Sequence, residues 1–281
     1  MLDFQLRDMV ERTLTEDMGQ VGDVTTMATV GPKIKGKGSI VAREGLVVSG
    51  LAVARMTFLV VDPTVKFEAV AKDGARLAKG DVIATLSGSL RSILIAERPA
   101  LNFLGRLSGI ATNTHAFVEA VTGLTAKVVD TRKTTPLHRA LEKAAIRHGG
   151  AHNHRFNLTD GILIKDNHVI ACGGVEQAVA EAKKNLPHHL IKIGVEVDRI
   201  DQIEPALAAG AEHLLLDNMA PTTLKKAVAL VDGRATTEAS GGVRLNTVRG
   251  IAETGVDFIS SGSLIHAARW VDVALDFDTS L

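Results

Sequence analysis

The sequence predicts an α/β fold whose second half is a parallel βα barrel. From residue 126 onwards, short apolar runs alternate with helical patterns, as in proteins built from βαβ units. Several of the runs are apolar throughout, which indicates strands buried on both faces. Polar residues follow most of the runs immediately. A closed barrel is the preferred architecture, and an open doubly wound sheet is the alternative.

The first half of the chain has a different pattern of predicted helices and strands. The spacing of apolar residues predicts a helix over 6–14, and residues 16–26 read as a polar loop. Short strand-like runs, separated by Gly and Asp, lie at 40–42, 46–48, 65–67 and 82–85, with a helical pattern at 51–59. A long helical stretch follows over 97–120, and Ser108-Gly109 is expected to interrupt it.

The second half supplies the elements of the barrel and a candidate site. Its predicted strands lie at 126–129, 161–164, 191–195, 213–216, 235–237 and 258–260. Its predicted helices include 174–185, 199–209, 222–231 and 245–254. Because parallel barrel strands end at one face, the polar residues after them should converge there. These residues are Asp130-Thr131-Arg132-Lys133, Lys165-Asp166-Asn167-His168, Glu196, Asp217-Asn218, Glu238-Ala239-Ser240-Gly241-Gly242 and Ser261-Gly262-Ser263. Each cluster alone could be a helix cap or a turn, but together they predict a shared site.

Composition narrows the classes of partner. The 281 residues are 46% hydrophobic and 23% charged, as in ordinary globular proteins. Basic and acidic residues balance at 32 each, so the basic excess typical of nucleic-acid binding is missing. The N-terminus is charged where a signal peptide needs an apolar core, and no uncharged apolar run is long enough for a membrane span. With Cys172 as the single cysteine, we expect a cytoplasmic protein.

Positive charge is concentrated in residues 130–168. This segment holds seven lysines and arginines against four acids, although the whole chain is neutral. Four of the cations lie at predicted strand ends or beside an Asn-His pair, namely Arg132, Lys133, Arg155 and Lys165. Guanidinium groups match planar carboxylates and phosphates, so a substrate with several negative charges is expected.

Carboxylates and small residues complete the candidate site. Glu196 and Asp217 beside an anion site suggest Mg²⁺ or the hydroxyls of a sugar, although each could instead pair with a lysine. Ser240-Gly241-Gly242 and Ser261-Gly262-Ser263 place small residues just before predicted helices. Backbone N–H groups at such turns can bind phosphate.

These motifs resemble the quinolinate phosphoribosyltransferase family in order and spacing, over nearly the whole chain. The matching segments are Glu16-Asp17, Gly22-Asp23-Val24-Thr25-Thr26, Glu97-Arg98, Leu107-Ser108-Gly109-Ile110-Ala111-Thr112, Asp130-Thr131-Arg132-Lys133-Thr134-Thr135-Pro136, Asn153-His154-Arg155, Ile164-Lys165-Asp166-Asn167-His168, Leu216-Asp217-Asn218 and Glu238-Ala239-Ser240-Gly241-Gly242. The resemblance implies a pentosyltransferase that moves phosphoribosyl from 5-phosphoribosyl 1-pyrophosphate (PRPP) to quinolinate with decarboxylation. Its products would be nicotinate mononucleotide, pyrophosphate and CO₂, on the de novo route to NAD.

The resemblance also implies a fold and an assembly. An N-terminal α/β sandwich domain over 1–110 would precede an irregular βα barrel over 111–266, and a C-terminal helix over 267–281 would return to the first domain. Family members are homodimers in which an arginine reaches the partner's active site. By motif, that arginine is Arg98.

Roles for the site residues follow from the same resemblance. Arg132, His154 and Arg155 would hold the quinolinate carboxylates, with Arg98 from the neighbouring subunit. The implied catalytic residues are Lys133 and Lys165, between quinolinate and PRPP, and Glu196 and Asp217, which would face the ribose and Mg²⁺, partly through water. The phosphate groups would be held by Ser240, Gly241 and Gly242 and by Ser261, Gly262 and Ser263.

Two motifs depart from the family pattern, and two alternative functions stay open. The usual Thr-Pro-Gly-Leu-Arg is here Thr135-Pro136-Leu137-His138-Arg139, and the usual Glu-Val-Glu is Gly194-Val195-Glu196. One alternative is a molybdenum-associated paralogue of the same fold, which tends to lack the Asn-His-Arg signature. The other is a non-catalytic barrel that binds a phosphorylated ligand. Asn153-His154-Arg155 argues against the first, and the density of cations and acids argues against the second.

Overall fold

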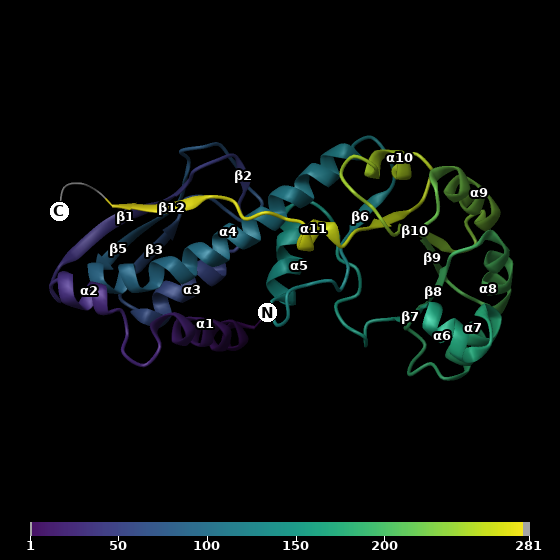
Figure 1. The fold of residues 1–281 in the computed structure, drawn as a ribbon, viewed down its shortest axis with the longest axis horizontal. Helices are drawn as coiled ribbons and strands as arrows, with labels where there is room; N and C mark the ends of the chain where they lie inside the picture. Colours follow the sequence, from purple (N-terminus) through teal and green to yellow (C-terminus); the bar gives the residue numbers. More distant parts are fainter. Residues whose placement is uncertain (1, 278–281) are drawn as a thin grey trace. The chain divides into compact units, whose positions relative to one another are not determined.

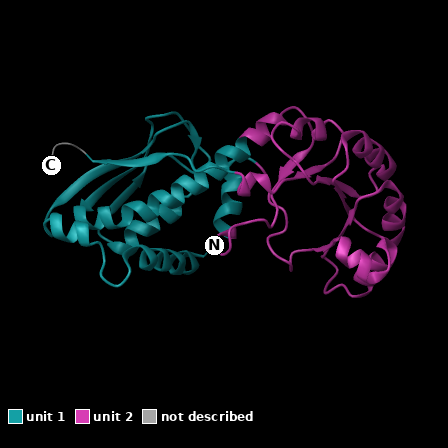
Figure 2. Ribbon diagram, in the orientation of Figure 1, with its two compact units in different colours: residues 1–115, 140–150, 268–281 teal, residues 116–139, 151–267 magenta. Residues whose placement is uncertain are grey.

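The computed structural model describes residues 2–277, which divide into two compact units (Figure 2). The described residues of unit 1 lie within 1–115, 140–150 and 268–281, and unit 2 comprises 116–139 and 151–267. The predicted boundary at 110 therefore lies a few residues before the structural one. The assignment of 140–150 to unit 1 was not predicted.

Unit 1 contains a four-stranded antiparallel sheet in the order β12-β1-β5-β3 (Figure 1). Its strands are β1 (Lys35–Ala42), β3 (Lys66–Ala69), β5 (Val82–Ser89) and β12 (Val273–Phe277), and a second small sheet pairs β2 (Leu46–Val47) with β4 (Arg76–Leu77). The helices of this part of the chain are α1 (Asp3–Met18), α2 (Val24–Thr29), α3 (Leu51–Val61), α4 (Leu90–Ala120) and α5 (Arg139–His148). Fully buried Ile40, Phe58, Ile83 and Ile93 join the sheet to α3 and α4 in one apolar core.

The C-terminal segment is a strand, so the predicted helix over 267–281 is wrong. Residues Val273–Phe277 pair antiparallel with β1, from Ala42↔Val273 to Gly38↔Phe277. Val273, Leu275 and Phe277 share one face of the strand and belong to the apolar core or pack against it, which suits an edge strand with one buried face. The last part of the predicted helix, residues 278–281, lies outside the described residues.

Two predictions about the first half also need correction. Helix α4 runs unbroken through Ser108-Gly109, where an interruption was expected. A Cβ at Gly109 would lie 2.0 Å from Arg269 O, so this glycine allows a close approach of two backbones. The predicted polar loop over 16–26 is partly helical, because α2 begins at Val24 and the Asp23 carboxylate accepts a 2.9 Å hydrogen bond from Thr26 N–H.

Unit 2 contains the parallel sheet that the alternating pattern predicted. Its six strands have the order β6-β11-β10-β9-β8-β7, so the first strand lies beside the last. They are β6 (Lys127–Val129), β7 (Ile162–Ile164), β8 (Ile193–Val197), β9 (His213–Asp217), β10 (Thr236–Ser240) and β11 (Phe258–Ser260). The helices between them are α6 (Asp166–Cys172), α7 (Val175–Lys184), α8 (Ile203–Ala209) after a 3₁₀ turn at Ile200–Gln202, α9 (Pro221–Val231), α10 (Val248–Ala252) and α11 (Ser263–His266). Figure 1 shows the sheet curved into a ring with α7 to α10 on its outside.

The ring is not closed by strand pairing. Among the described residues, β6 and β7 are the two edges of the sheet. Val129 of β6 instead forms a parallel bridge with His152, in the segment that leads to β7. The barrel is therefore irregular, as the family resemblance implied, and the closed barrel favoured by the apolar runs alone is wrong.

Candidate active site

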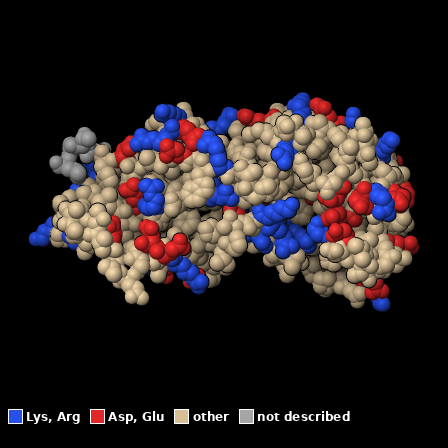
Figure 3. Space-filling view, viewed as in Figure 1, with Lys and Arg blue, Asp and Glu red and all other residues tan. Residues whose placement is uncertain are grey.

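The polar residues at the strand ends of unit 2 come together in neighbouring pairs. Lys165, after β7, forms an ion pair with Glu196 of β8. Asp217 of β9 is in register with Ser240 of β10. Figure 3 shows Lys and Arg side chains gathered over the loops after β6, beside Asp and Glu side chains near β8 and β9. The structure thus brings opposite charges together at the carboxyl ends of the strands.

Two arginines form the cationic centre of the site. Burial lowers the pKa of Arg155, and the positive charge of Arg132 lowers it further, whereas Asp160 raises it. Arg132 Nε is buried and has no hydrogen-bond partner among the described residues. Arg155 Nη1 donates to Gly161 O at 2.9 Å. Because a buried donor without a partner is costly, this arrangement suits an anionic ligand.

The segment that carries His154 and Arg155 is fixed by Asp130. This fully buried carboxylate accepts a 2.8 Å hydrogen bond from Asn153 Nδ2 and a 2.7 Å bond from His154 N–H. The Asn-His-Arg motif is therefore tied to the end of β6. Asp130, which sequence reasoning left without a role, positions the binding residues.

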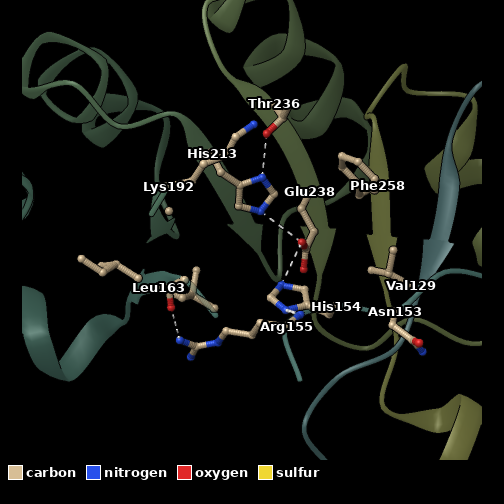
Figure 4. Close-up of a pocket in the computed structure, with 13 residues that line it drawn as sticks. Val129, Asn153, His154, Arg155, Leu163, Lys192, His213, Thr236, Glu238 and Phe258 are labelled. Atoms are coloured by element: carbon tan, nitrogen blue, oxygen red, sulfur yellow. Dashed lines mark hydrogen bonds and ion pairs between the residues drawn. The ribbon is translucent and has the colours of Figure 1, made fainter. Parts of the chain in front are cut away.

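A pocket of about 310 Å³ lies beside this segment (Figure 4). His154, Arg155, His213 and Glu238 supply its main polar side chains, and Leu163 and Phe258 belong to its apolar wall. Its volume is in the range of sites for small molecules.

The buried acid of the pocket is Glu238, whose side chain is 3% exposed. Burial by itself raises the pKa of Glu238, but hydrogen bonds from His154 and His213 outweigh it and lower the pKa to about 2. Sequence reasoning assigned no role to Glu238 or His213. The sequence did hold a signal for both residues, because every second residue of a strand lies on the same face. By this rule Glu238 shares a face of β10 with Ser240, and His213 shares a face of β9 with Asp217.

Glu196 and Asp217 are the carboxylates of the site that could hold a magnesium ion. Both are carboxylates of neighbouring strands, and Asp217 Oδ2 accepts a 2.6 Å hydrogen bond from Asn218 Nδ2. Mg²⁺ prefers oxygen ligands and is commonly held by one or two carboxylates together with substrate phosphates. The carboxylate oxygens are therefore of the kind that Mg²⁺ prefers. Glu196 also forms an ion pair with Lys165, so the same carboxylate orients a cation of the site.

The two serine-glycine turns, at residues 240–242 and 261–263, differ in structure. Gly241 and Gly242 have φ of 89° and 63°, and a Cβ at Gly241 would lie 2.1 Å from Asn218 Oδ1. In the second turn, the hydroxyls of Ser261 and Ser263 donate to Val243 O at 3.1 and 3.2 Å. These hydroxyls therefore already bind the chain itself.

Lys133 and Gly262 lie against each other. A Cβ at Gly262 would lie 2.8 Å from Lys133 Cδ. A glycine at this position therefore allows the lysine stem to cross the second serine-glycine turn. This contact places Lys133 beside the predicted phosphate turn.

Arg98 is exposed on α4 in unit 1. It neighbours Glu97, whose pKa is raised by burial and lowered in turn by the charge of Arg98. Its predicted role across a dimer interface stays a prediction. Among the described residues, no helix is both long enough and apolar enough to span a membrane.

One departure from the family pattern has a visible structural effect. Leu137 has φ of 68°, in the left-handed region that glycine adopts without strain. Its side chain is exposed, at 85%, so packing does not offset the strain. The glycine expected at this position matches the backbone that the loop adopts.

Comparison with known proteins agrees with this geometry. The family model for the N-terminal domain of quinolinate phosphoribosyl transferase matches residues 23–108, and the model for its C-terminal domain matches 110–276. A probable nicotinate-nucleotide pyrophosphorylase (carboxylating) of Bacillus subtilis is 40% identical over 276 residues, covering 98% of this chain and 94% of the relative. Quinolinate phosphoribosyltransferase (decarboxylating) 1b of Nicotiana tabacum is 39% identical, covering 99% of this chain and 84% of the relative.

Solved structures agree over the full length as well. NadC from Streptococcus pyogenes has a TM-score of 0.94 at 41% identity, with 99% of each chain covered. The nicotinate-nucleotide pyrophosphorylase of Francisella tularensis has a TM-score of 0.94 at 34% identity, covering 99% of this chain and 98% of the other. Both units are thus matched in sequence and in fold, and the chain belongs to the quinolinate phosphoribosyltransferase family.

Proposed function

We propose that this protein is a decarboxylating quinolinate phosphoribosyltransferase of NAD biosynthesis. Its substrates are quinolinate and PRPP, and its products are nicotinate mononucleotide, pyrophosphate and CO₂. Family membership and the names of relatives such as the Nicotiana tabacum enzyme support this assignment.

The proximity of Arg132 and Arg155 gives the strongest support for quinolinate as the substrate. The charge of Arg132 lowers the pKa of Arg155, and Arg132 Nε is buried without a hydrogen-bond partner among the described residues. Quinolinate carries two adjacent carboxylates, which complement two neighbouring guanidinium groups. A neutral ligand would leave this charge uncompensated.

The residues of the site position and screen the reactants. Lys133 and Lys165 offset the negative charge of PRPP, and Glu196 orients Lys165 through their ion pair. The pyridine nitrogen attacks the anomeric carbon of PRPP as its bond to pyrophosphate breaks. The carboxylate next to the nitrogen then leaves as CO₂, and its bonding electrons pass into the pyridinium ring. A proton replaces it on that carbon.

Magnesium would be held by Glu196 and Asp217 together with substrate oxygens. When bound, it would neutralise charge that develops on the departing pyrophosphate. Its requirement is tested by activity after chelation, with recovery on adding Mg²⁺ back.

The product is the direct test of the proposed function. Incubation with quinolinate, PRPP and Mg²⁺ should form nicotinate mononucleotide, identified by mass spectrometry. Nicotinate, which lacks the second carboxylate, should not replace quinolinate. Absence of nicotinate mononucleotide from a folded, magnesium-loaded protein would contradict the proposal.

A homodimer with a composite site is part of the proposal, with Arg98 donated by the neighbouring subunit. Mixing Arg98→Ala with Arg132→Ala under conditions of subunit exchange places both lesions in one site of each heterodimer. Activity should recover to roughly a quarter of wild type, because about half of randomly paired dimers are mixed and half of their sites are intact. If native mass spectrometry shows heterodimers but activity stays absent, Arg98 acts within its own subunit. The cytoplasmic location stays a prediction.

A further inference from the structure

A chain of hydrogen bonds crosses the pocket from Thr236 to Arg155 (Figure 4). His213 Nδ1 lies 2.8 Å from Thr236 Oγ1, and His213 Nε2 lies 3.1 Å from Glu238 Oε2. The same carboxylate oxygen lies 3.3 Å from His154 Nε2. His154 Nδ1 accepts a 2.7 Å hydrogen bond from Arg155 N–H. The first residues of β9 and β10 are thereby linked to the arginine of the substrate site.

His213 joins Thr236 to Glu238 through its two ring nitrogens. The Thr236 hydroxyl lies 2.8 Å from His213 Nδ1 and 3.3 Å from Glu212 O. The Glu238 carboxylate accepts, so His213 donates to it from Nε2–H. His213 therefore holds Glu238 and is itself fixed by Thr236.

His154 extends the chain of hydrogen bonds from Glu238 to Arg155. Its Nδ1 accepts from Arg155 N–H, and its Nε2 lies 3.3 Å from Glu238 Oε2 as a donor. Both ring nitrogens of His154 are thus bonded within the protein. In this arrangement the ring links Glu238 to Arg155, a different task from the carboxylate contact that the family resemblance implied.

Glu238 depends on His213 for one of the two hydrogen bonds that hold its buried carboxylate. The Glu238 side chain is 3% exposed, and its Oε1 has no hydrogen-bond partner among the described residues. Removing the partner of a buried charge is strongly unfavourable, because the remaining charge is left uncompensated. Loss of His213 should therefore displace Glu238 and the ring that it holds.

The position of the His213 ring depends on Gly194. A Cβ at residue 194 would lie 3.2 Å from His213 Cδ2 and 3.3 Å from Leu163 Cδ1. Gly194 is also the place where the sequence lacks the first acid of the Glu-Val-Glu motif. The missing side chain at 194 thus leaves the room that His213 occupies.

We propose that His213 is a positioning residue of this site, which acts through Glu238 and His154 to hold Arg155 for a carboxylate of the substrate. The inference rests on the proposed function only for the identity of that substrate. The three side chains could also be read as metal ligands, since their ligand atoms lie within 4.8 Å of one another. A metal on His154 Nε2 requires a proton on Nδ1, where the Arg155 N–H already donates, so the hydrogen-bonded arrangement is favoured.

Steady-state kinetics should separate positioning from general damage. His213→Leu should raise KM for quinolinate on the order of 10- to 100-fold, while kcat and KM for PRPP change little, because ground-state and transition-state binding weaken together. His213→Gln keeps an N–H donor for Glu238 and should restore most of the affinity. The exposed His189→Leu is the matched control. Equal losses in kcat and in both KM values would overturn the proposal.

A double variant tests whether His213 acts through Glu238. Adding Glu238→Gln to His213→Leu removes the uncompensated charge, so the double variant should bind quinolinate more tightly than His213→Leu alone. Isothermal titration calorimetry measures this binding without turnover. A further loss of affinity in the double variant would show that the two residues act separately.

Nitrogen-15 NMR of the histidine rings tests the wild-type protein directly. We expect His213 Nε2 and His154 Nε2 each to carry a proton that is hydrogen-bonded to Glu238, and His154 Nδ1 to carry none. An unprotonated His213 Nε2, or a proton on His154 Nδ1, would refute the account even if every variant failed to fold. Stoichiometric Zn²⁺ binding that His213→Leu abolishes would instead identify a metal site and overturn the proposal. If the wild type made no nicotinate mononucleotide, the proposed function would fail, while the NMR result would still decide the role of His213.

Discussion

Arg132 and Arg155 lie close enough in unit 2 for the charge of Arg132 to lower the pKa of Arg155. Two neighbouring like charges destabilise a folded protein unless a ligand or a counter-ion compensates them. This relationship therefore marks the part of the molecule that is organised for binding.

Arg132→Lys should reduce kcat/KM strongly, although it keeps the charge. Lysine cannot make the paired hydrogen bonds of a guanidinium group, so the loss of transition-state stabilisation should be about 2–5 kcal/mol. The control is Arg234→Lys, at an exposed ion pair with Glu204. Near-normal kcat/KM in Arg132→Lys would remove Arg132 from the site.

Asp217→Asn should weaken the use of PRPP and leave quinolinate binding largely intact. The reason is that Asp217 is assigned to the ribose and magnesium side of the site, away from the arginines that bind quinolinate. Saturation kinetics with PRPP and calorimetric titration with quinolinate measure the two effects separately. Abolished quinolinate binding would contradict the assignment.

Glu238 should make stability depend on acidic pH. Its pKa is about 2 in the folded protein against 4.5 ordinarily, so the unfolded chain takes up the proton first. The stabilisation is present above pH 4.5 and is lost as pH falls towards 2, and its size is on the order of 3 kcal/mol. Urea unfolding from pH 7 to pH 3 should show the wild type's advantage over Glu238→Gln shrinking with acid. A constant gap would mean that the pKa of Glu238 is not depressed.

Leu137→Gly should stabilise the protein. The left-handed backbone at Leu137 strains a side chain that is exposed, so removing the side chain loses little packing. Relief of strain, less the greater freedom of glycine in the unfolded chain, should amount to about 0.5–1 kcal/mol. Chemical denaturation measures the change, and Leu158→Gly, at another exposed leucine, is the control. A destabilised Leu137→Gly would show that Leu137 makes favourable contacts.

The strand-end residues could be predicted because periodicity and position carry the information. Apolar runs located β6 to β11, and the polar residues after them, such as Lys165 and Asp217, followed from the phase of the pattern. The assignment of α5 to unit 1 could not be predicted in this way. It depends on contacts between distant residues, such as the 3.0 Å ion pair of Arg106 with Glu142.

His213 and Glu238 were missed for a related reason. Both lie inside strands, where a polar residue looks like an exception to an apolar run. Their importance comes from the register, which places His213 opposite Thr236 and two residue pairs away from Glu238. Register between strands is set by packing in three dimensions, so one sequence does not reveal it.

Coupled release of CO₂ and pyrophosphate distinguishes decarboxylating phosphoribosyl transfer from any other use of PRPP. With quinolinate labelled in the carboxylate next to the ring nitrogen, we expect one labelled CO₂ per pyrophosphate, only when PRPP and Mg²⁺ are both present. Arg132→Ala should abolish both products while the protein stays folded by circular dichroism. Pyrophosphate release without labelled CO₂, or neither product from the folded wild type, would contradict the assignment of this protein as a decarboxylating quinolinate phosphoribosyltransferase.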